Sequence, residues 1–220
     1  FPFDPPYVPQ ENPCGLYEHT FEYEVDQNAP EVFLNFEGVD SCFYVWLNGA
    51  YVGYSQVSHS TSEFDVTSYV KSGENTMRVL VLKWCDGSYL EDQDKFRMSG
   101  IFRDVYLLKR PQRHIWDYRI TTHVEGAAAA VDVHCLLAGG DLPIYARIEN
   151  AEGQVVAEGS LRSLANKGQK SGLAESGKEQ EMSLDNLAMQ YKAQVQFCIE
   201  NPVFWNTENP YLYTLILETE

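Results

Sequence analysis

The segment 41–54, SCFYVWLNGAYVGY, constrains the fold of this chain more than any other stretch. It places Asn48-Gly49 between two runs that are rich in aromatic and β-branched residues. Both central positions of a two-residue hairpin turn need a positive φ, which Asn and Gly tolerate. We therefore predict two antiparallel strands that meet at this dipeptide.

The rest of the first half also carries strand signals. Apolar side chains alternate along 32–37 and again along 77–82, after a turn at 71–75. Segment 100–108, GIFRDVYLL, is a further predicted strand. Short strands at this spacing, with turn residues between them, are typical of an antiparallel sandwich.

A charged, proline-bearing stretch at 109–115 interrupts the apolar runs and is predicted to be a linker. A second series of strand signals follows, and a long exposed loop is expected over 159–181, where Gly, Ser, Lys and Glu dominate. The predicted strands are 118–124, 130–137, 143–150, 191–200 and 211–220, with a hairpin at 152–156. About seven short strands over roughly a hundred residues fit an immunoglobulin-like sandwich.

Charge narrows the possible partners. The 220 residues include 32 acidic residues against 16 Lys plus Arg, a formal net charge of −16. Nucleic acids and anionic membrane surfaces are therefore not expected as partners, because both are bound through clustered cations. No apolar run reaches the length of a membrane span, and the opening FPFDPPYVP is no signal peptide. We expect that opening to be the interior of a longer polypeptide.

The spacing of the cysteines and the motifs that the sequence lacks exclude several classes of site. The five cysteines are scattered, with no C-x-x-C pair, so neither a disulfide framework nor a zinc site is expected. Buried thiols in a reducing compartment are the simpler interpretation. Phosphate-binding loops, H-E-x-x-H helices and nucleophile elbows are also missing from the sequence.

The segment 87–104, GSYLEDQDKFRMSGIFRD, concentrates charge. Its charged residues include Glu91, Asp92, Asp94, Lys95, Arg97 and Arg103. One interpretation is a solvated loop that makes salt bridges. The other is a carboxylate held ready for sugar hydroxyls or a cation, and oriented by an arginine. Trp46 and Trp84, in contrast, lie within strand patterns and are expected to pack in the core.

Longer motifs resemble a known family. The stretches VPQENPCGLYEHTF, FEGVDSCFYVWLNGAYVGYSQ, SEFDVTSYVKSGENTMRVLVLKW and DGSYLEDQDKFRMSGIFRDVYLLKRP are similar to the amino-terminal jelly-roll domain of bacterial LacZ-type β-galactosidases in glycoside hydrolase family 2. The similarity is dense to about residue 111. Beyond it, ENPVFWNTENPYLYTLILE resembles the last strands of the immunoglobulin-like domain that follows in that family. The resemblance implies an all-β chain with a jelly-roll sandwich at 1–111 and an immunoglobulin-like sandwich at 112–220.

The resemblance also implies ligands for three residues. Asp94, the second Asp of E-D-Q-D, would contact galactose hydroxyls and a sodium ion in the active site of a neighbouring barrel. Gln56 and Asp86 would belong to a peripheral magnesium site whose other ligands lie upstream. An ionised carboxylate suits both roles of Asp94, because it accepts hydroxyl hydrogen bonds and is a hard ligand for cations.

The catalytic residues of the family are expected elsewhere. They are two glutamates on a (β/α)8 barrel of about 250 residues, and retention requires them about 5 Å apart. The chain ends at Glu220, where that barrel would begin, so we expect no catalytic residue here, no activity from this piece alone and no cofactor requirement for it. The family further implies a cytoplasmic, homo-oligomeric parent enzyme. The alternative is a carbohydrate-binding module that works by itself, which should offer an exposed aromatic platform.

Overall fold

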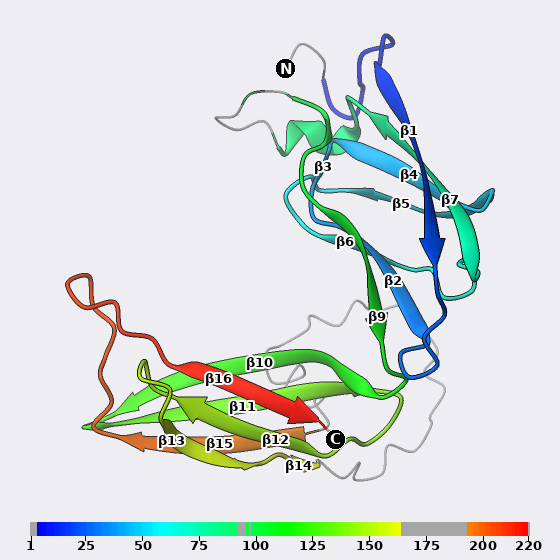
Figure 1. Cartoon of the computed structure of the whole chain (residues 1–220). Helices are drawn as coiled ribbons and strands as arrows, with labels where there is room; N and C mark the ends of the chain where they lie inside the picture. The colour runs from blue at the N-terminus through cyan, green and yellow to red at the C-terminus, as the bar shows by residue number, and fades with distance from the viewer. Residues whose placement is uncertain (1–3, 92–95, 97, 164–192, 220) are drawn as a thin grey trace, which may run out of the picture. The chain divides into compact units, whose positions relative to one another are not determined.

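The computed structural model describes residues 4–91, 96, 98–163 and 193–219, and the chain divides into two compact units, Phe1–Gln112 and Arg113–Glu220 (Figure 1). Over the described residues the regular structure is β-strand, apart from one turn of 3₁₀ helix. No helix in these ranges is long and apolar enough to cross a membrane. The prediction of an all-β chain is confirmed.

The first unit contains a four-stranded sheet in the order β1-β7-β4-β5 and a three-stranded sheet in the order β6-β2-β9, with a short β3-β8 pair. Every pairing in these sheets is antiparallel. The strands are β1 (Cys14–Tyr23), β2 (Glu31–Phe36), β3 (Val39–Asp40), β4 (Cys42–Leu47), β5 (Ala50–Gln56), β6 (Ser62–Asp65), β7 (Gly73–Leu82), β8 (Gly100–Ile101) and β9 (Val105–Arg110).

The core of this unit lies between the two larger sheets. Val45 and Val79 come from the four-stranded sheet, and Val32 and Phe36 come from β2. The rings of Phe36 and Phe43 meet across the sheets with centroids 4.7 Å apart. Burial of each such side chain stabilises the fold by roughly 1.5–3 kcal/mol.

Strand β2 departs from the simple alternation of its sequence. Phe33 and Asn35 are buried as fully as Val32 and Leu34, so both faces of the strand are covered. On the second face, the guanidinium of Arg110 lies 4.3 Å from the centre of the Phe33 ring. The apolar Phe33 and the polar Asn35 are therefore both buried on the second face of β2.

The predicted Asn-Gly hairpin is confirmed. Asn48 and Gly49 have φ values of 53° and 83°, and they join β4 to β5. The side chain of Asn48 also donates to Asn75 Oδ1 at 2.7 Å and accepts from the Thr76 N–H at 3.0 Å. The turn is thus tied to the start of β7 as well as to its own two strands.

The predicted strand 100–108 is broken in the structure into β8 and β9. The Phe102 N–H donates to the Gly38 carbonyl, and Asp104 accepts from the Glu37 N–H. A Cβ on Gly38 would lie 2.6 Å from the Phe102 ring, so this ring rests directly on the backbone of Gly38. The close contact diverts residues 102–104 from a regular strand.

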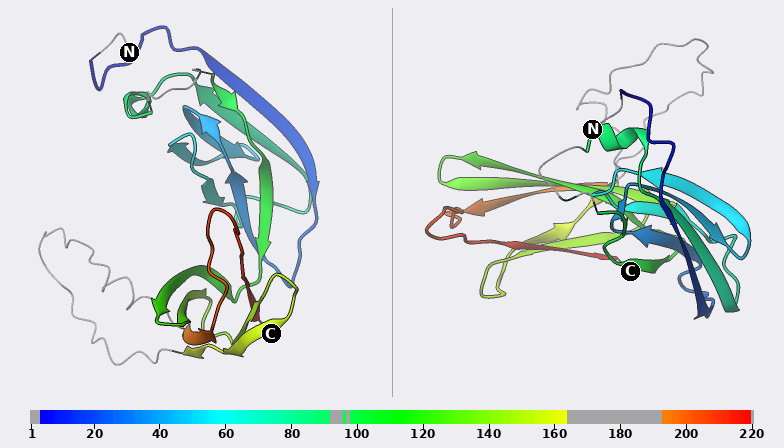
Figure 2. Two further views of the ribbon diagram at one scale, coloured as in Figure 1. Left: turned by 90° about the vertical axis from the view of Figure 1, so that its left-hand side faces the viewer. Right: turned by 90° about the horizontal axis from the view of Figure 1, so that it is seen from above.

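The second unit is a two-sheet sandwich. One sheet has the order β10-β11-β15-β14 and the other has the order β13-β12-β16. Figure 2 shows the two layers. The strands are β10 (His114–Glu125), β11 (Ala128–Ala138), β12 (Ile144–Glu149), β13 (Val155–Ser160), β14 (Arg162–Ser163), β15 (Ala193–Glu200) and β16 (Thr214–Thr219).

Side chains from both sheets form the core of the second unit, among them Val133, Cys135, Ala146 and Ile148. The predicted hairpin at 152–156 is confirmed, since Asn150 Oδ1 accepts from the N–H groups of Glu152 and Gln154. Strands extend into both ends of the predicted linker, because β9 runs to Arg110 and β10 starts at His114. Most of the predicted loop at 159–181 lies outside the described residues.

Candidate functional site

The acidic segment begins with the 3₁₀ turn η1 (Asp86–Tyr89), which follows β7. Ser88 Oγ accepts a hydrogen bond from the Cys85 N–H at 3.1 Å, and the Gly87 carbonyl accepts from Leu90 at 3.0 Å and Glu91 at 3.2 Å. These hydrogen bonds satisfy backbone groups of a short segment that belongs to no sheet. The turn therefore positions Glu91 at the start of the acidic cluster.

Glu91 connects this segment to the end of β5. Its Oε1 accepts from the Ser58 N–H at 2.7 Å, and its Oε2 accepts from the Ser58 hydroxyl at 3.1 Å. Ser58 is buried, and its hydroxyl also lies 2.9 Å from His59 Nδ1. Both carboxylate oxygens of Glu91 therefore accept hydrogen bonds from Ser58, which favours a structural role for Glu91 over ligand binding.

Asp94, the predicted contact for galactose and sodium, lies outside the described residues, as do Asp92, Lys95 and Arg97. The nearby Arg103 is described. Its guanidinium lies 5.5 Å from the centre of the Phe102 ring. The sodium assignment therefore remains a prediction from the motif.

Gln56 and Asp86, the predicted magnesium ligands, both lie beside Gly87. A Cβ on Gly87 would be 3.7 Å from Gln56 Oε1, and Asp86 Oδ1 accepts from the Gly87 N–H at 2.9 Å. Gln56 Oε1 also accepts from the Tyr54 hydroxyl at 2.8 Å. Two hard oxygens with lone pairs to spare fit part of a magnesium site. Among the described residues, no group of three His, Cys, Asp or Glu side chains could complete it.

Two thiols next to Gln56 and Asp86, those of Cys42 and Cys85, are buried as the sequence predicts, whereas Cys14 and Cys198 are exposed. The hydrogen bond from Cys42 is the main cause that lowers the pKa of Cys85 to about 6, and hydroxyls of Ser41 and Ser88 add to it. The same bond, with burial, raises the pKa of Cys42. Burial together with the nearby Cys42 raises the pKa of Tyr54.

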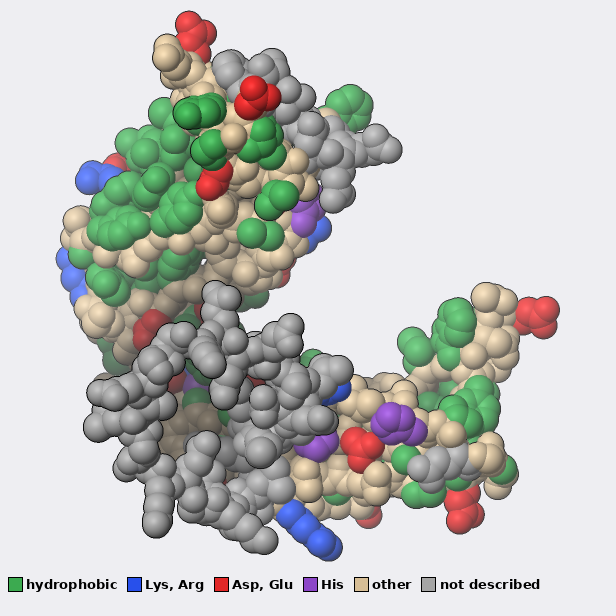
Figure 3. Space-filling view, turned by 180° about the vertical axis from the view of Figure 1, so that it is seen from behind, with side chains coloured by type: hydrophobic (Ala, Val, Ile, Leu, Met, Phe, Trp, Pro, Cys, Tyr) green, Lys and Arg blue, Asp and Glu red, His purple; other side chains and the backbone are tan. Residues whose placement is uncertain are grey.

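The prediction that Trp46 and Trp84 pack in the core is wrong. Both are half-buried, and Trp46 lies on the outside of the four-stranded sheet. There its ring neighbours Tyr44 at 6.2 Å and Tyr51 at 5.7 Å, and Tyr44 neighbours Tyr54 at 4.8 Å. We call these four rings the outer aromatic face. Figure 3 shows hydrophobic side chains gathered on the first unit.

The outer aromatic face is not flat. The ring planes are inclined to one another by 30°, 50° and 57° along the series. The four rings therefore form a tilted series and not one flat platform. The arrangement instead follows the twist of the sheet that carries it.

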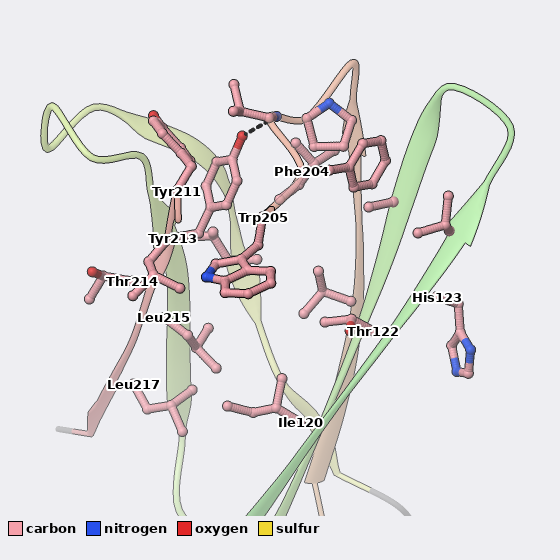
Figure 4. Close-up of a pocket in the computed structure, with 18 of the residues that line it drawn as sticks. Ile120, Thr122, His123, Phe204, Trp205, Tyr211, Tyr213, Thr214, Leu215 and Leu217 are labelled. Carbon is pink, nitrogen blue, oxygen red and sulfur yellow. Dashed lines mark hydrogen bonds between the residues drawn. The ribbon is translucent and has the colours of Figure 1, made fainter. Parts of the chain in front are cut away.

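A cavity that the sequence analysis did not predict lies in the second unit. It has a volume of about 820 Å³ and opens between β10 and β16, under the segment 202–213 (Figure 4). We call it the apolar groove. Trp205, which is 59% exposed, points into it, with Leu215 and Leu217 on one wall and Ile120 and Thr122 on the other (Figure 4).

Two of the polar groups at the apolar groove, the hydroxyls of Tyr211 and Tyr213, are already engaged. The Tyr213 hydroxyl accepts from the Val203 N–H at 2.9 Å. The Tyr211 hydroxyl accepts from the Ala151 N–H at 3.1 Å and donates to Glu152 at 3.0 Å. No carboxylate is among the lining residues of this described surface. Such a groove suits an apolar partner better than a sugar.

Comparisons with known families cover both units. A family model described as "Glycosyl hydrolases family 2, sugar binding domain" matches residues 1–111. A second, described as "Glycosyl hydrolases family 2", matches residues 113–220.

Curated relatives extend over the same region. A β-galactosidase of Staphylococcus xylosus is 43% identical over 221 residues, which is 100% of this chain and 19% of the relative. A β-galactosidase of Actinobacillus pleuropneumoniae is 42% identical with the same coverage. The chain thus spans about a fifth of the length of these curated relatives.

Solved structures share the fold. A β-glucuronidase of Bifidobacterium dentium has a TM-score of 0.71 at 21% identity, covering 94% of this chain and 36% of that one. A β-glucuronidase from an uncultured Clostridium species has a TM-score of 0.70 at 22% identity, covering 94% and 33%. At these identities the likeness concerns the fold alone.

Proposed function

The chain belongs to glycosyl hydrolase family 2, and on that premise we propose that it is the non-catalytic amino-terminal part of a β-galactosidase. The parent enzyme would hydrolyse terminal β-D-galactosides with retention of configuration. The observation that carries this proposal is the match to two β-galactosidases over the whole chain but only 19% of each relative. Such coverage fits a piece that lacks the catalytic barrel.

Asp94 is the residue that we propose to contact the substrate. In the parent it would accept hydrogen bonds from galactose hydroxyls and bind sodium beside them. The hydrogen bonds of Glu91 to Ser58 support this role indirectly, because they hold the chain three residues before Asp94. Electrostatic stabilisation by a carboxylate depends on such prior positioning.

Gln56 and Asp86 would hold magnesium in the parent, together with upstream ligands. The metal would supply positive charge beside η1 and so stabilise the turn that precedes the acidic cluster. We assign it no part in bond cleavage. The isolated chain would need neither ion in order to fold.

The apolar groove supports a scaffolding role for the second unit. Monomeric proteins rarely leave large contiguous apolar patches exposed, and such patches commonly mark interaction sites. Trp205, Leu215 and Ile120 offer this kind of surface. We propose that it is covered in the parent by the catalytic part of the polypeptide, and that the parent is a cytoplasmic homo-oligomer.

A stand-alone carbohydrate-binding module is the alternative function. Its best support is the partial exposure of Tyr51, Tyr54 and Trp205. The engaged hydroxyls of Tyr211 and Tyr213 at the apolar groove argue against it. Binding of galactose, lactose or a soluble galactan to the purified chain, measured by calorimetry, would favour this alternative.

Activity measurements test the main proposal. The purified chain should not hydrolyse a chromogenic galactoside, and the full-length parent should. In the parent, Asp94→Asn should raise KM for the galactoside and weaken the dependence of the rate on sodium. Glu24→Gln, at an exposed position just past the end of β1 where Tyr23 pairs with Gly73, is the control and should leave both unchanged.

Two outcomes would contradict the proposal. One is turnover that co-elutes with the purified chain through repeated chromatography. The other is a parent whose Asp94→Asn variant keeps its normal KM and sodium response while the isolated variant chain unfolds at a lower temperature. Asp94 would then be a structural residue.

A further inference from the structure

The two sheets of the second unit do not cover each other completely. One has four strands, in the order β10-β11-β15-β14, and the other has three, in the order β13-β12-β16. A Cβ on Gly159 of β13 would lie 3.5 Å from the Phe197 ring of β15, so β13 packs on β15. Strand β10 therefore lies at the other end of the sandwich, beside β16, where the apolar groove opens.

Strand β10 carries apolar side chains on the face that forms the core elsewhere. The antiparallel register places Tyr118 and Ile120 of β10 opposite Cys135 and Val133 of β11. Residues directly opposite in such a pair share one face of the sheet. Val133 and Cys135 are 0% exposed, whereas Tyr118 and Ile120 are 58% and 43% exposed. The core face of this sheet is therefore left open at β10.

Strand β16 offers backbone groups at the same opening. In the part of the chain that the structure describes, β16 pairs with β12 alone and ends its sheet. In an antiparallel pair, every second residue directs its N–H and C=O away from the partner strand. These groups of β16 point to the open side of the sheet, where a further strand would lie about 4.8 Å away. The sequence of β16, TLILET, contains neither the Pro nor the Lys that commonly protects an edge strand.

We propose that the apolar groove receives one β-strand, an extended segment of the parent polypeptide outside this chain, which pairs with the free edge of β16. Alternate side chains of this strand would lie beside Leu215 and Leu217 and against Ile120, on the two walls of the groove (Figure 4), so they would be apolar. Its backbone would satisfy the edge groups of β16, which an apolar small molecule could not do. The inference rests on the proposed function, because that function supplies the parent polypeptide.

The parent polypeptide is the source of the strand that the observations favour. The chain matches only 19% of each of two curated relatives, so most of such a polypeptide lies outside it. A segment of the same molecule has a high effective concentration at the groove. A second copy of this chain would instead bring a net charge of −16 against an equal charge.

Hydrogen–deuterium exchange tests the proposal by comparing the full-length parent with the purified 220-residue chain. In the parent, every second amide of β16 should exchange at least about a hundredfold more slowly than in the chain, because it gains a hydrogen-bond partner. Strand β13, at the other edge of the same sheet, is the control and should exchange at the same rate in both proteins.

A photo-crosslinker identifies the strand. Tyr118→p-benzoylphenylalanine in the parent keeps an aromatic side chain at an exposed position of the groove. After irradiation, peptide mass spectrometry should find this position joined to one segment, in which apolar and polar residues alternate. A synthetic peptide of that segment should bind the purified chain and slow the exchange of the same β16 amides.

Two variants at similarly exposed apolar positions complete the test. Ile120→Glu, at a position 43% exposed, should restore fast exchange of β16 in the parent, because the strand would bury a carboxylate. Val155→Glu, at a position 48% exposed on β13, should not. Circular dichroism of both purified variant chains establishes that they fold.

Three outcomes would overturn the proposal. One is equally fast exchange of β16 in the parent and in the chain. Another is slow exchange in the isolated chain that depends on its concentration, which would assign the edge to a second copy. The third is a crosslink to a helix. Galactoside turnover is measured separately: turnover with a freely exchanging β16 refutes the strand and keeps the proposed function, and a protected β16 without turnover does the reverse.

Discussion

At the scale of single residues, Glu91 shows how one carboxylate joins two segments. It accepts two hydrogen bonds from the buried Ser58, one from the N–H and one from the hydroxyl. Glu91→Gln keeps the length of the side chain but removes its charge, so we expect a loss of about 1–2 kcal/mol in the free energy of unfolding. Urea denaturation of the purified chain measures it.

Glu11→Gln is the control for this change, because it removes the same charge at an exposed position. It should alter stability by less than about 0.5 kcal/mol. Equal effects of the two substitutions would mean that net charge, and not the contact with Ser58, accounts for the loss.

We make a separate prediction for Cys135, the buried cysteine of the second unit. Burial, helped by the charge of Asp117, raises the pKa of Cys135 to about 11. At pH 8 only about one molecule in a thousand would carry the reactive thiolate there. Iodoacetamide should therefore label Cys14 and Cys198 first, and Cys135 only after unfolding. Labelling of native Cys135 at the rate of Cys198 would contradict this.

Residue patterns predicted only part of the candidate site. The sequence identified Glu91 only as one charged residue of segment 87–104, and its partner Ser58 lies 33 residues earlier in sequence and carries no signal of its own. Trp205 was missed for a similar reason, since its exposure depends on how segment 202–213 folds over β16. Contacts between segments that are distant in sequence are not encoded in local spacing.

At the scale of elements, Asn75 organises the approach to β7. Its exposed fraction is 0%, and its amide donates to the carbonyls of Lys71 at 2.7 Å and Gly73 at 2.8 Å. Its Oδ1 accepts from the Lys71 N–H and from Asn48. Asn75→Ala would leave these groups without their partner inside the fold, so we expect a loss of about 3 kcal/mol.

Chemical denaturation checks this value against Asn28→Ala, which changes an exposed turn residue of the same type. The control should cost less than about 1 kcal/mol. A loss below that limit for Asn75→Ala as well would show that water can replace the network.

Strand signals predicted the elements better than their boundaries. The Asn48-Gly49 hairpin follows from local φ requirements and was found where expected. The break in 100–108 depends on the ring of Phe102 resting on Gly38, more than sixty residues earlier. Likewise, on the second face of β2 the Phe33 ring is covered by the guanidinium of Arg110, 77 residues later in sequence (110 minus 33). Tertiary contacts overrode the local pattern in both places.

At the scale of the whole molecule, charge is the dominant property. A net charge of −16 should make the folded chain repel itself at low ionic strength. We expect that a change from about 20 mM to about 300 mM NaCl at pH 7 raises the free energy of unfolding by about 1 kcal/mol, because salt screens this repulsion. Urea denaturation at both salt concentrations measures the difference.

The same comparison near the isoelectric point is the control. At a pH close to the sequence pI of about 4.6, the repulsion vanishes and salt should have little effect. If salt instead lowers stability at pH 7, attractive ion pairs such as Arg110–Glu63, at 2.9 Å, would outweigh the repulsion.

The pairing of β2 with β9 determines when this sheet can form during synthesis of the chain. Glu31 pairs with Arg110, so the sheet cannot close until 79 further residues (110 minus 31) have been made. At about 5–20 residues per second, this takes roughly 4–16 s. Meanwhile Val32, Leu34 and Phe36 remain exposed on the nascent chain and open to chaperones. A ribosome arrested before residue 100 should therefore present a β2 segment that protease cleaves, and one arrested well past residue 150 should not.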